Sequence, residues 1–310
     1  MISQGQIAET ARLAGVLEGA ATRPAQSFWS ESWERLRANR AGMLAAAVIV
    51  FMALVALAAP LLSALVTHHN FHEQDIQNNF APPLFPGHVL GTDEIGRDTL
   101  TRLIWGAQVS LGVGFLTVAI SVVVGTSVGL SAGYFGGLAD DVLMRLVDVI
   151  LSIPRLFLFI LVGILFFRSA SLVSLSLVIA SVGWGATARL VRGEVLSIRN
   201  RDFMLATRSL GAGHLRLILR HLLPNALPVL IVAASLGVGG VILAEAALDY
   251  LGFGIHPPTP SWGNMLSNAQ QYFTHSIWLV FLPGVCIFIT VLAANLFGNA
   301  VRDAFDPRLR

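Results

Sequence analysis

The sequence contains no lysine and only one cysteine, and both shortages exclude functions. All 20 basic residues are arginine, so the phosphate-binding loop that ends in Lys-Ser/Thr cannot form, and the chain cannot bind ATP in that way. A lone Cys286 cannot form an intrachain disulfide or a cysteine cage for a metal ion. We expect the chain to bind no cofactor and no metal.

Charged residues are also few. They make up 12% of the 310 residues, about half the share in an average soluble protein, while hydrophobic residues make up 55%. A single globule of this size cannot cover its surface with 38 charged residues, so part of the surface must face lipid. The net charge of +2 does not indicate nucleic acid, because the arginines lie in short segments between apolar runs and form no basic stripe.

Long uncharged runs indicate helices that cross a membrane, which takes about 20 apolar residues. Five runs qualify: 41–66, 103–139, 169–188, 222–244 and 276–301. A sixth run, from about Leu146 to Arg168, is interrupted by Asp148, Pro154 and Arg155. Since proline removes a backbone hydrogen bond, we expect a kinked helix here, with its charges facing protein or water. The predicted fold class is an all-α membrane protein with six transmembrane helices.

The distribution of arginine predicts the orientation. With the N-terminus inside, the cytoplasmic segments hold 16 arginines and the external segments three, so both termini are expected in the cytoplasm. The polar first 40 residues lack the compact apolar core of a cleaved signal peptide. The expected order is a cytoplasmic tail (1–40), a first transmembrane helix (41–66), an external segment (67–102), a five-helix core (103–301) with a cytoplasmic segment (189–221) and an external loop (245–275), and a cytoplasmic tail (302–310).

The cytoplasmic segment 189–221 is expected to contain a short amphipathic helix. Its apolar residues recur at i, i+3 and i+7, with charged residues between them: Phe203, Ala206 and Leu210. Asn200 or Asp202 can cap its N-terminus, and Gly211 and Gly213 can end it. Such a helix lies on lipid, packs on its own chain or docks into a partner's groove, and the periodicity does not choose among the three.

The second long run has a glycine at every fourth position: Gly125, Gly129, Gly133 and Gly137. Glycines at this spacing form one smooth helix face that lets another helix approach closely, for either movable or static packing. Two of them flank Ser131 in a Gly-x-Ser-x-Gly pattern, which makes an intramembrane serine protease the alternative function from another class. The glycine ladder already accounts for the pattern and no histidine lies in mid-membrane, so packing is favoured.

Three positions in the spans are candidates for a gate or for the transport pathway: Asp148, Pro154 and Glu245. Asp148 lies one turn from Arg145 and about two turns from Arg155, which favours a structural ion pair over a substrate or proton site. Glu245 lies where the fifth span emerges, near Asp249, and is interpreted as an interface or gate residue.

The external segments 67–102 and 245–275 are rich in proline, glycine, asparagine and aromatic residues. They are therefore expected to be ordered and to meet a soluble partner or cap a pathway. The first contains His68, His69 and His72 close to two acidic residues. Because these side chains have no fixed helical or ribbon spacing, a solvated polar loop is favoured over a metal site.

Four longer stretches carry a resemblance to a known family. They are HVLGTDEIGRDTLTRLIWGAQVSL (88–111), AGYFGGLADDVLMRLVDVILSIP (132–154), EAALDYLGFGIHPPTPSWGNMLSN (245–268) and AFDPRLR (304–310). With them, about residues 30 to 310 resemble the membrane permease subunits of bacterial ABC importers, in the dipeptide, oligopeptide and nickel group, and within it the second of the two permeases. The resemblance implies the MetI-like permease fold with a cytoplasmic coupling helix.

In similar permeases the coupling helix docks in a cleft of a cytoplasmic ATPase, so the resemblance implies this role for the amphipathic helix that includes Asp202, Phe203 and Leu210. The family's signature is Glu-Ala-Ala, a glycine four residues on, and Leu-Pro. At that spacing this sequence has Leu205, Ala206, Thr207, Gly211, Leu223 and Pro224. The acidic position is Leu205, and Asp202, three residues earlier, is the candidate to replace the glutamate.

The resemblance also implies the partners. They are a homologous permease that forms a heterodimer with this chain, two ATP-binding subunits that use ATP and magnesium, an external substrate-binding protein and membrane lipid, with no nucleic acid. The chain itself is then not an enzyme but a multi-pass protein of the bacterial plasma membrane that translocates short peptides. Nickel or a nickel chelate is the alternative cargo, because the family serves both.

Overall fold

The computed structural model describes residues 28–166 and 171–306. Most of the expected N-terminal tail (1–27), Arg168 and the last residues of the C-terminal tail (307–310) lie outside the described residues. All regular structure in the described part is helical, apart from two isolated bridges, between Phe85 and His88 and between Thr92 and Asp98. The predicted all-α fold class is confirmed.

Long helices make up most of the described chain. They are α2 (Phe28–Ala38), α3 (Arg40–Leu57), α5 (Thr99–Phe135), α6 (Gly137–Ser152), α7 (Arg155–Phe166), α8 (Leu172–Ile198), α11 (Leu223–Tyr250) and α13 (Trp278–Phe305). Shorter elements connect them: α4 (Ala59–Leu62), η1 (Ser63–Thr67), η2 (Ile76–Asn78), α9 (Asp202–Ser209), α10 (His214–Leu217), η3 (Ile218–Leu222) and α12 (Trp262–Ala269).

Five helical stretches of the described chain are long and apolar enough to cross a membrane: α3, α5, α8, the run from α10 through α11 (His214–Tyr250), and α13. α6 and α7 qualify only as a pair, which is bent by 100° at the break between them. The described residues therefore provide five spans, or six if this pair is one span. The first span, expected over 41–66, is α3 followed closely by α4 and η1.

The bend between α6 and α7 takes the place of the expected kinked helix. α6 already begins at Gly137, well before Leu146, and the chain leaves the helical conformation at Ile153. Ile153 is extended (φ −94°, ψ 136°), as a residue before proline prefers, because the ring of Pro154 clashes with a helical backbone there. The interruption is at the expected place, but the span starts earlier and turns sharply.

Other helices also extend beyond the expected spans. α5 starts at Thr99, where the Asp98 carboxylate accepts a hydrogen bond from a first-turn amide, and α8 and α11 run on to Ile198 and Tyr250. Hydropathy marks the lipid-facing part of a helix, whereas the backbone stays helical until a cap or a turn ends it. α5 ends at Phe135, and Gly136 (φ 67°) alone connects it to α6.

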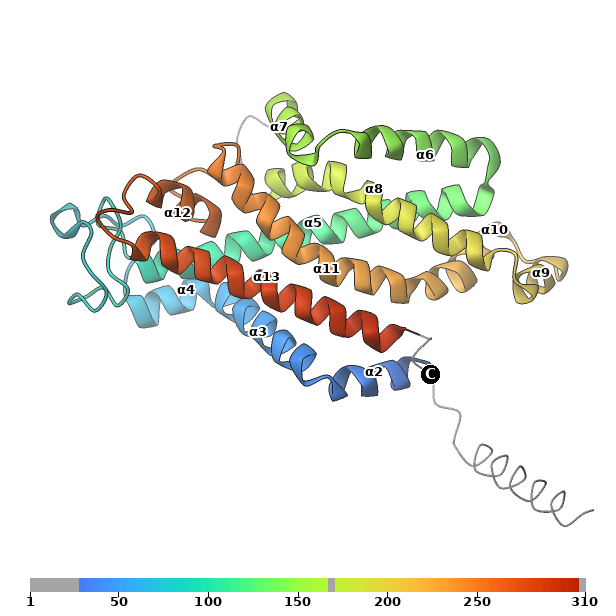
Figure 1. Cartoon of the computed structure of the whole chain (residues 1–310), viewed down its shortest axis with the longest axis horizontal. Coiled ribbons are helices and arrows are strands. Elements are labelled where there is room, and N and C mark those ends of the chain that lie inside the picture. Colours follow the sequence, from blue (N-terminus) through green and yellow to red (C-terminus); the bar gives the residue numbers. More distant parts are fainter. Residues whose placement is uncertain (1–27, 167–170, 307–310) are drawn as a thin grey trace, which may run out of the picture.

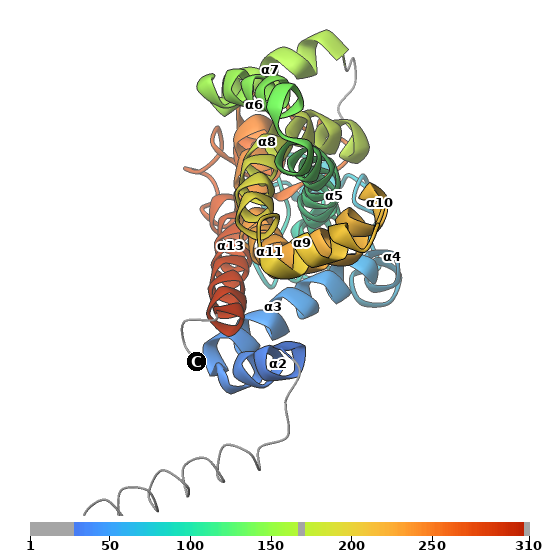
Figure 2. The same cartoon turned by 90° about the vertical axis from the view of Figure 1, so that its right-hand side faces the viewer.

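The long helices form one elongated bundle (Figure 1). The segment between η1 and α5 lies at one end together with α12, and α9, α10, α2 and the end of α13 lie at the other. α2 packs against the end of α13, where the rings of Phe28 and Trp29 contact Phe305. Along the bundle, α6 and α7 lie on one side and α2 and α3 on the opposite side, with α5, α8 and α11 between them (Figure 2).

α5 and α8 approach each other very closely along the glycine face of α5. A Cβ at Gly129 would lie 2.5 Å from the carbonyl oxygen of Ala188, and one at Gly125 or Gly133 would lie 2.6 or 2.8 Å from a side chain of α8. Only hydrogen fits at these positions, so the two backbones pack directly on each other. Gly137 is not part of this contact, because α5 ends before it and Gly137 (φ 53°) starts α6.

Replacing Gly129 by alanine is expected to destabilise the protein by about 1–3 kcal/mol, because the added methyl group must displace the backbone of α8. Thermal unfolding of the purified protein in detergent should show a lower Tm. Gly193→Ala on α8 is the matched control, since no described atom lies within 4 Å of a Cβ at that position. Equal Tm values for the two variants would contradict the close contact.

Candidate coupling site and transport pathway

α9 (Asp202–Ser209) is a short helix outside the bundle of long helices. Its N-cap is Arg201, without a capping hydrogen bond from the side chain, so the expected cap by Asn200 or Asp202 is wrong. Asp202 is instead the first helical residue, where its negative charge is favourable at the positive end of the helix dipole. Gly211 (φ 81°) follows the helix in the left-handed conformation that ends many helices, as its position predicts.

The two faces of α9 differ in exposure. Met204 is buried, with 3% of its surface exposed, whereas Phe203, Leu205 and Leu210 are 41%, 49% and 88% exposed. Ala206 is exposed as well. The predicted apolar face therefore points away from the described part of the chain. An exposed apolar face of this kind indicates a contact surface for another protein or for lipid.

Met204 anchors α9 in a buried cluster at this end of the bundle. The other buried members come from α5, α8, α10, η3 and α11: Leu130, Tyr134, Val191, Val195, Ile198, Leu217, Leu222 and Leu230. Two polar contacts support the same junction. The Tyr134 hydroxyl lies 2.7 Å from Nδ1 of His214, and the Arg199 guanidinium donates to the Gly133 carbonyl at 2.9 Å. Through Met204, α9 thus shares one buried cluster with residues of three long helices, α5, α8 and α11.

The Leu-Pro pair is separate from α9. Leu223 and Pro224 are the first residues of α11 and follow directly on the π-helical turn η3, so they lie inside the continuous helical run His214–Tyr250. Pro224 is exposed and Leu223 is half-buried. On α9 itself, Thr207 is half-buried and its hydroxyl donates to the Phe203 carbonyl at 2.7 Å. Of the expected coupling residues, those of α9 share one short helix, and the Leu-Pro pair lies within the next span.

A cavity of about 640 Å³ lies between α5, α7, α8 and α11. Most of its walls are apolar or glycine, and cavities of this volume hold small molecules in other proteins. Its polar lining residues are Thr117, Ser121, Arg155 and Thr187. The expected pathway candidates Asp148, Pro154 and Glu245 are not among the residues that line it.

Asp148 forms an ion pair across two helices. Its carboxylate lies 2.6 Å from the Arg189 guanidinium on α8, and Asp140 of α6 pairs in the same way with Arg192. α6 and α8 pack side by side, which brings these groups together, whereas Arg155 lies beyond the bend. The structural ion pair is present, but its expected partners, Arg145 and Arg155, are wrong. Both groups of the Asp148 pair are more than half exposed, so it contributes at most about 1 kcal/mol.

Glu245 and Asp249 fasten α12 to the ends of α5 and α11. Asp249 accepts hydrogen bonds from the Ile255 amide, at 2.5 Å, and from the Ser261 hydroxyl. Glu245 accepts one from the Ser110 hydroxyl at 3.2 Å. Both acidic residues are buried. This geometry favours the interface interpretation of Glu245 over the gate interpretation, because its carboxyl group is enclosed by packed helices.

Ser110, Ser261 and Asn264 belong to the same hydrogen-bonded group as Glu245 and Asp249, which we call the α12 brace, and the sequence analysis does not single them out. The Ser261 hydroxyl accepts from the Asn264 amide at 3.0 Å, and the Asn264 side chain accepts from the Ser261 amide at 3.1 Å. This reciprocal pair is a capping box, and the spacing Ser-x-x-Asn was the signal that could have located α12. Ser110 has no local signal, because Glu245 lies 135 residues away in the sequence.

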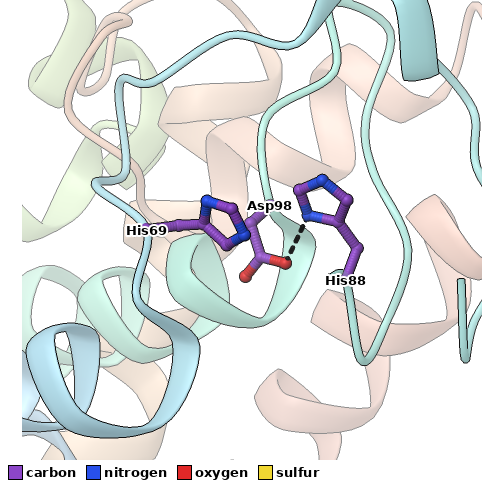
Figure 3. Close-up of side chains that lie close together, drawn as sticks. All are labelled: His69, His88 and Asp98. Carbon is purple, nitrogen blue, oxygen red and sulfur yellow. Dashed lines mark hydrogen bonds and ion pairs between the residues drawn. The ribbon is translucent and has the colours of Figure 1, made fainter. Parts of the chain in front are cut away.

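Three side chains of metal-binding type come together beside the start of α5 (Figure 3). One ligand atom each of His69, His88 and Asp98 lies within 4.8 Å of the others. Asp98 accepts a hydrogen bond from Nδ1 of His88 at 3.0 Å, and Nε2 of His69 lies 3.0 Å from the Gly87 carbonyl. The two imidazole rings stack 4.6 Å apart with 16° between their planes, so their in-plane lone pairs do not converge on one ion. The group suits a loop anchor better than a metal centre, and His69 is more than a solvated loop residue.

Ser131 does not have the geometry of a nucleophile. It lies inside the continuous helix α5, and its hydroxyl donates to the Ser127 carbonyl at 2.8 Å. A serine nucleophile of the Gly-x-Ser-x-Gly type needs a sharp turn and a base within hydrogen-bond reach. Its flanking glycines pack against α8 instead. The serine protease alternative is therefore wrong.

Comparison with known protein families accounts for this architecture. Residues 125–310 match the family described as the inner membrane component of binding-protein-dependent transport systems. Residues 27–83 match the N-terminal TM domain of oligopeptide transport permease C. The chain belongs to this family of transport permeases.

Relatives resemble the permease over nearly its whole length. It is 39% identical over 292 residues to the dipeptide transport system permease protein DppC of Haemophilus influenzae, covering 93% of this chain and 96% of that protein. It is 40% identical over 292 residues to the di/tripeptide transport system permease protein DppC of Pseudomonas aeruginosa, covering 93% of each. It is 34% identical over 284 residues to the oligopeptide transport system permease protein OppC of Bacillus subtilis, covering 92% and 91%. The permease is of the DppC/OppC type.

The fold of the permease is also that of a solved importer. A structure of the MetNI methionine ABC transporter in an inward-facing conformation matches with a TM-score of 0.55 at 20% identity, covering 67% of this chain and 97% of that chain. The likeness confirms the predicted MetI-like fold. The permease is a multi-pass inner-membrane component of an ABC importer, works with ATPase and permease partners, and is not itself catalytic.

Ser261→Ala is expected to lower the free energy of unfolding by about 1–3 kcal/mol, because the substitution removes the cap of α12 and a hydrogen bond to a buried carboxyl group. Ser127→Ala is the matched control, since the Ser127 hydroxyl is exposed and bonds only within its own helix, to Val123. Chemical unfolding of both variants in detergent measures the difference. A Ser261→Ala variant as stable as Ser127→Ala would show that the brace does not hold α12.

Proposed function

We propose that the permease forms half of the membrane pathway of an ATP-driven importer of short peptides. In this proposal it pairs with a homologous permease to form a heterodimer. One of two ATP-binding subunits docks on its α9, and an external binding protein delivers cargo at the end that carries α12. Both termini then lie in the cytoplasm, in agreement with the 16 arginines on that side. ATP and magnesium are bound by the ATPase subunits, because this chain has no lysine for a phosphate-binding loop.

The exposed apolar face of α9 is the observation that supports the coupling role most directly. Phe203 and Leu210 are available to a partner, while Met204 on the opposite face is packed against the ends of α5, α8 and α11. A helix held in this way carries the movement of a docked subunit into the spans. ATP binding favours one arrangement of the ATPases, and the spans follow to the extent that docking is tighter in that arrangement.

Leu205 occupies the position at which the family signature places a glutamate. Its side chain is about half exposed, so contact at this position is apolar in this permease. Asp202 is the acidic residue of α9, and it lies in the first turn, three residues before Leu205. We infer that Asp202 supplies the negative charge of the docking surface, while the apolar residues supply most of its contact area.

The names of the relatives favour peptides as cargo. They are permeases for dipeptides, for di- and tripeptides and for oligopeptides, and the glutathione transport system permease protein GsiD of Escherichia coli is 36% identical over 282 residues. Each of these cargoes is a short peptide or is built like one. The cavity of about 640 Å³ has room for such a molecule. The alternative cargo, nickel, has no comparable support.

The complete transporter, reconstituted in liposomes with its binding protein, is expected to accumulate radiolabelled dialanine when ATP is supplied to the ATPase side. Excess unlabelled di- and tripeptides should compete, and EDTA on the binding-protein side should have no effect. Uptake of nickel without uptake of peptide would contradict the proposed cargo and support the alternative.

Leu210→Asp is expected to weaken the association with the ATPase by about tenfold or more, because it places a charge in an apolar contact. Co-purification of the ATPase with the tagged permease measures the loss. Leu84→Asp is the matched control: Leu84 is 85% exposed, similar to the 88% of Leu210, but lies at the opposite end of the bundle.

The same assay tests the contribution of Asp202. Asp202→Ala should reduce co-purification less than Leu210→Asp does, because an exposed charge contributes little beside an apolar contact. If Leu210→Asp retained the ATPase as well as Leu84→Asp did, α9 would not be the docking helix.

A further inference from the structure

Arg155 is the only charged residue among the described residues that line the large cavity. It is the first residue of α7, directly after the bend at Pro154, and it lines the cavity together with residues from the middle of α5 and α8. Its side chain is exposed and is therefore accessible to a molecule that enters the cavity.

No acidic residue of the described chain pairs with Arg155. Asp148 of the preceding helix pairs with Arg189. Glu245 and Asp249 of α11 accept hydrogen bonds from hydroxyl and amide donors, and Oε2 of Glu245 has no partner among the described residues, but neither residue lines the cavity. The other helices that line the cavity contribute no carboxylate to its wall. The positive charge of Arg155 is thus unbalanced within the described part of the chain.

Ser121 also lines this cavity, but its hydroxyl does not face it. The hydroxyl oxygen is buried without a hydrogen-bond partner among the described residues, and a Cβ at Gly183 of α8 would lie 3.0 Å from it. A ligand in the cavity therefore does not reach this oxygen, and Arg155 is the charged group of the wall that can bind an anion.

We propose that Arg155 forms a subsite that binds the C-terminal carboxylate of the transported peptide. A guanidinium recognises a carboxylate through two parallel hydrogen bonds, which suits the end of a peptide. The apolar and glycine-rich remainder of the wall accepts side chains of different shape without specific hydrogen bonds. This assignment rests on the proposed peptide cargo, and it makes the free carboxylate the group that every substrate shares.

The test uses the purified complete transporter without its binding protein, so that the specificity of that protein does not enter. Two photoreactive probes are compared: the dipeptide alanyl-benzoylphenylalanine and its C-terminal amide. After illumination, labelled peptides of this permease are identified by mass spectrometry. The free acid is expected to label the segments that line the cavity, and the amide is expected to label them about tenfold or more weakly, because one charge-assisted contact is lost.

Variants of the permease assign the effect to Arg155. Arg155→Gln should reduce labelling by the free acid to the level of the amide, and Arg155→Lys should retain much of it. Arg189→Gln is the matched control, since this arginine pairs with Asp148 and does not line the cavity. Its labelling should equal that of the unmodified protein.

Several results would overturn the subsite. Among the probe results, these are equal labelling by acid and amide, no labelling of the cavity segments, and competition by phosphatidylglycerol but not by dialanine. Unchanged labelling of Arg155→Gln would also overturn it, as would loss of the partner permease from Arg155→Gln, which would assign the arginine to the interface between permeases.

The dialanine uptake assay distinguishes failure of the subsite from failure of the proposed function. Normal uptake combined with any of these results rejects the subsite alone, and absence of uptake rejects the peptide cargo.

Discussion

The close contact between α5 and α8 is the constraint on which the other features depend. Because Gly125, Gly129 and Gly133 have no side chains, the two backbones pack directly on each other. α5 therefore contributes to three sites. Its residue Ser110 donates a hydrogen bond to Glu245 near α12, the middle of α5 forms a wall of the cavity, and Tyr134 belongs to the buried cluster that contains Met204 of α9. A side chain at the glycine face would disturb all three sites together, since they share this helix.

This arrangement links the two ends of the permease. At one end, the buried Glu245 and Asp249 connect the capped helix α12 to α5 and α11 through hydrogen bonds. At the other end, Met204 packs α9 against the same helices. The helices that α9 contacts at this end also form walls of the cavity. The exposed ion pair between Asp148 and Arg189 contributes little energy to the packing of α6 on α8.

The sequence predicts the parts of this structure that follow local rules. Uncharged runs locate the spans, the periodicity of Phe203, Ala206 and Leu210 locates α9, and Pro154 locates the break after α6. It does not predict partners that are distant in the chain, such as Arg189 for Asp148. Nor does it predict that the ladder ends before Gly137, because glycine spacing does not tell where a helix stops.

The turn at Pro154 gives the cavity an unusual wall. α7 crosses the bundle instead of running along it. This short helix lines one side of the cavity, and it is joined to α6 through Ile153, where the helical hydrogen bonds are interrupted. Packing holds this segment in place, because Phe159 of α7 is buried in a cluster with residues of α5 and α8. A change in the width of the cavity that moves α7 must therefore separate this apolar contact, although it breaks no helical hydrogen bond at Ile153.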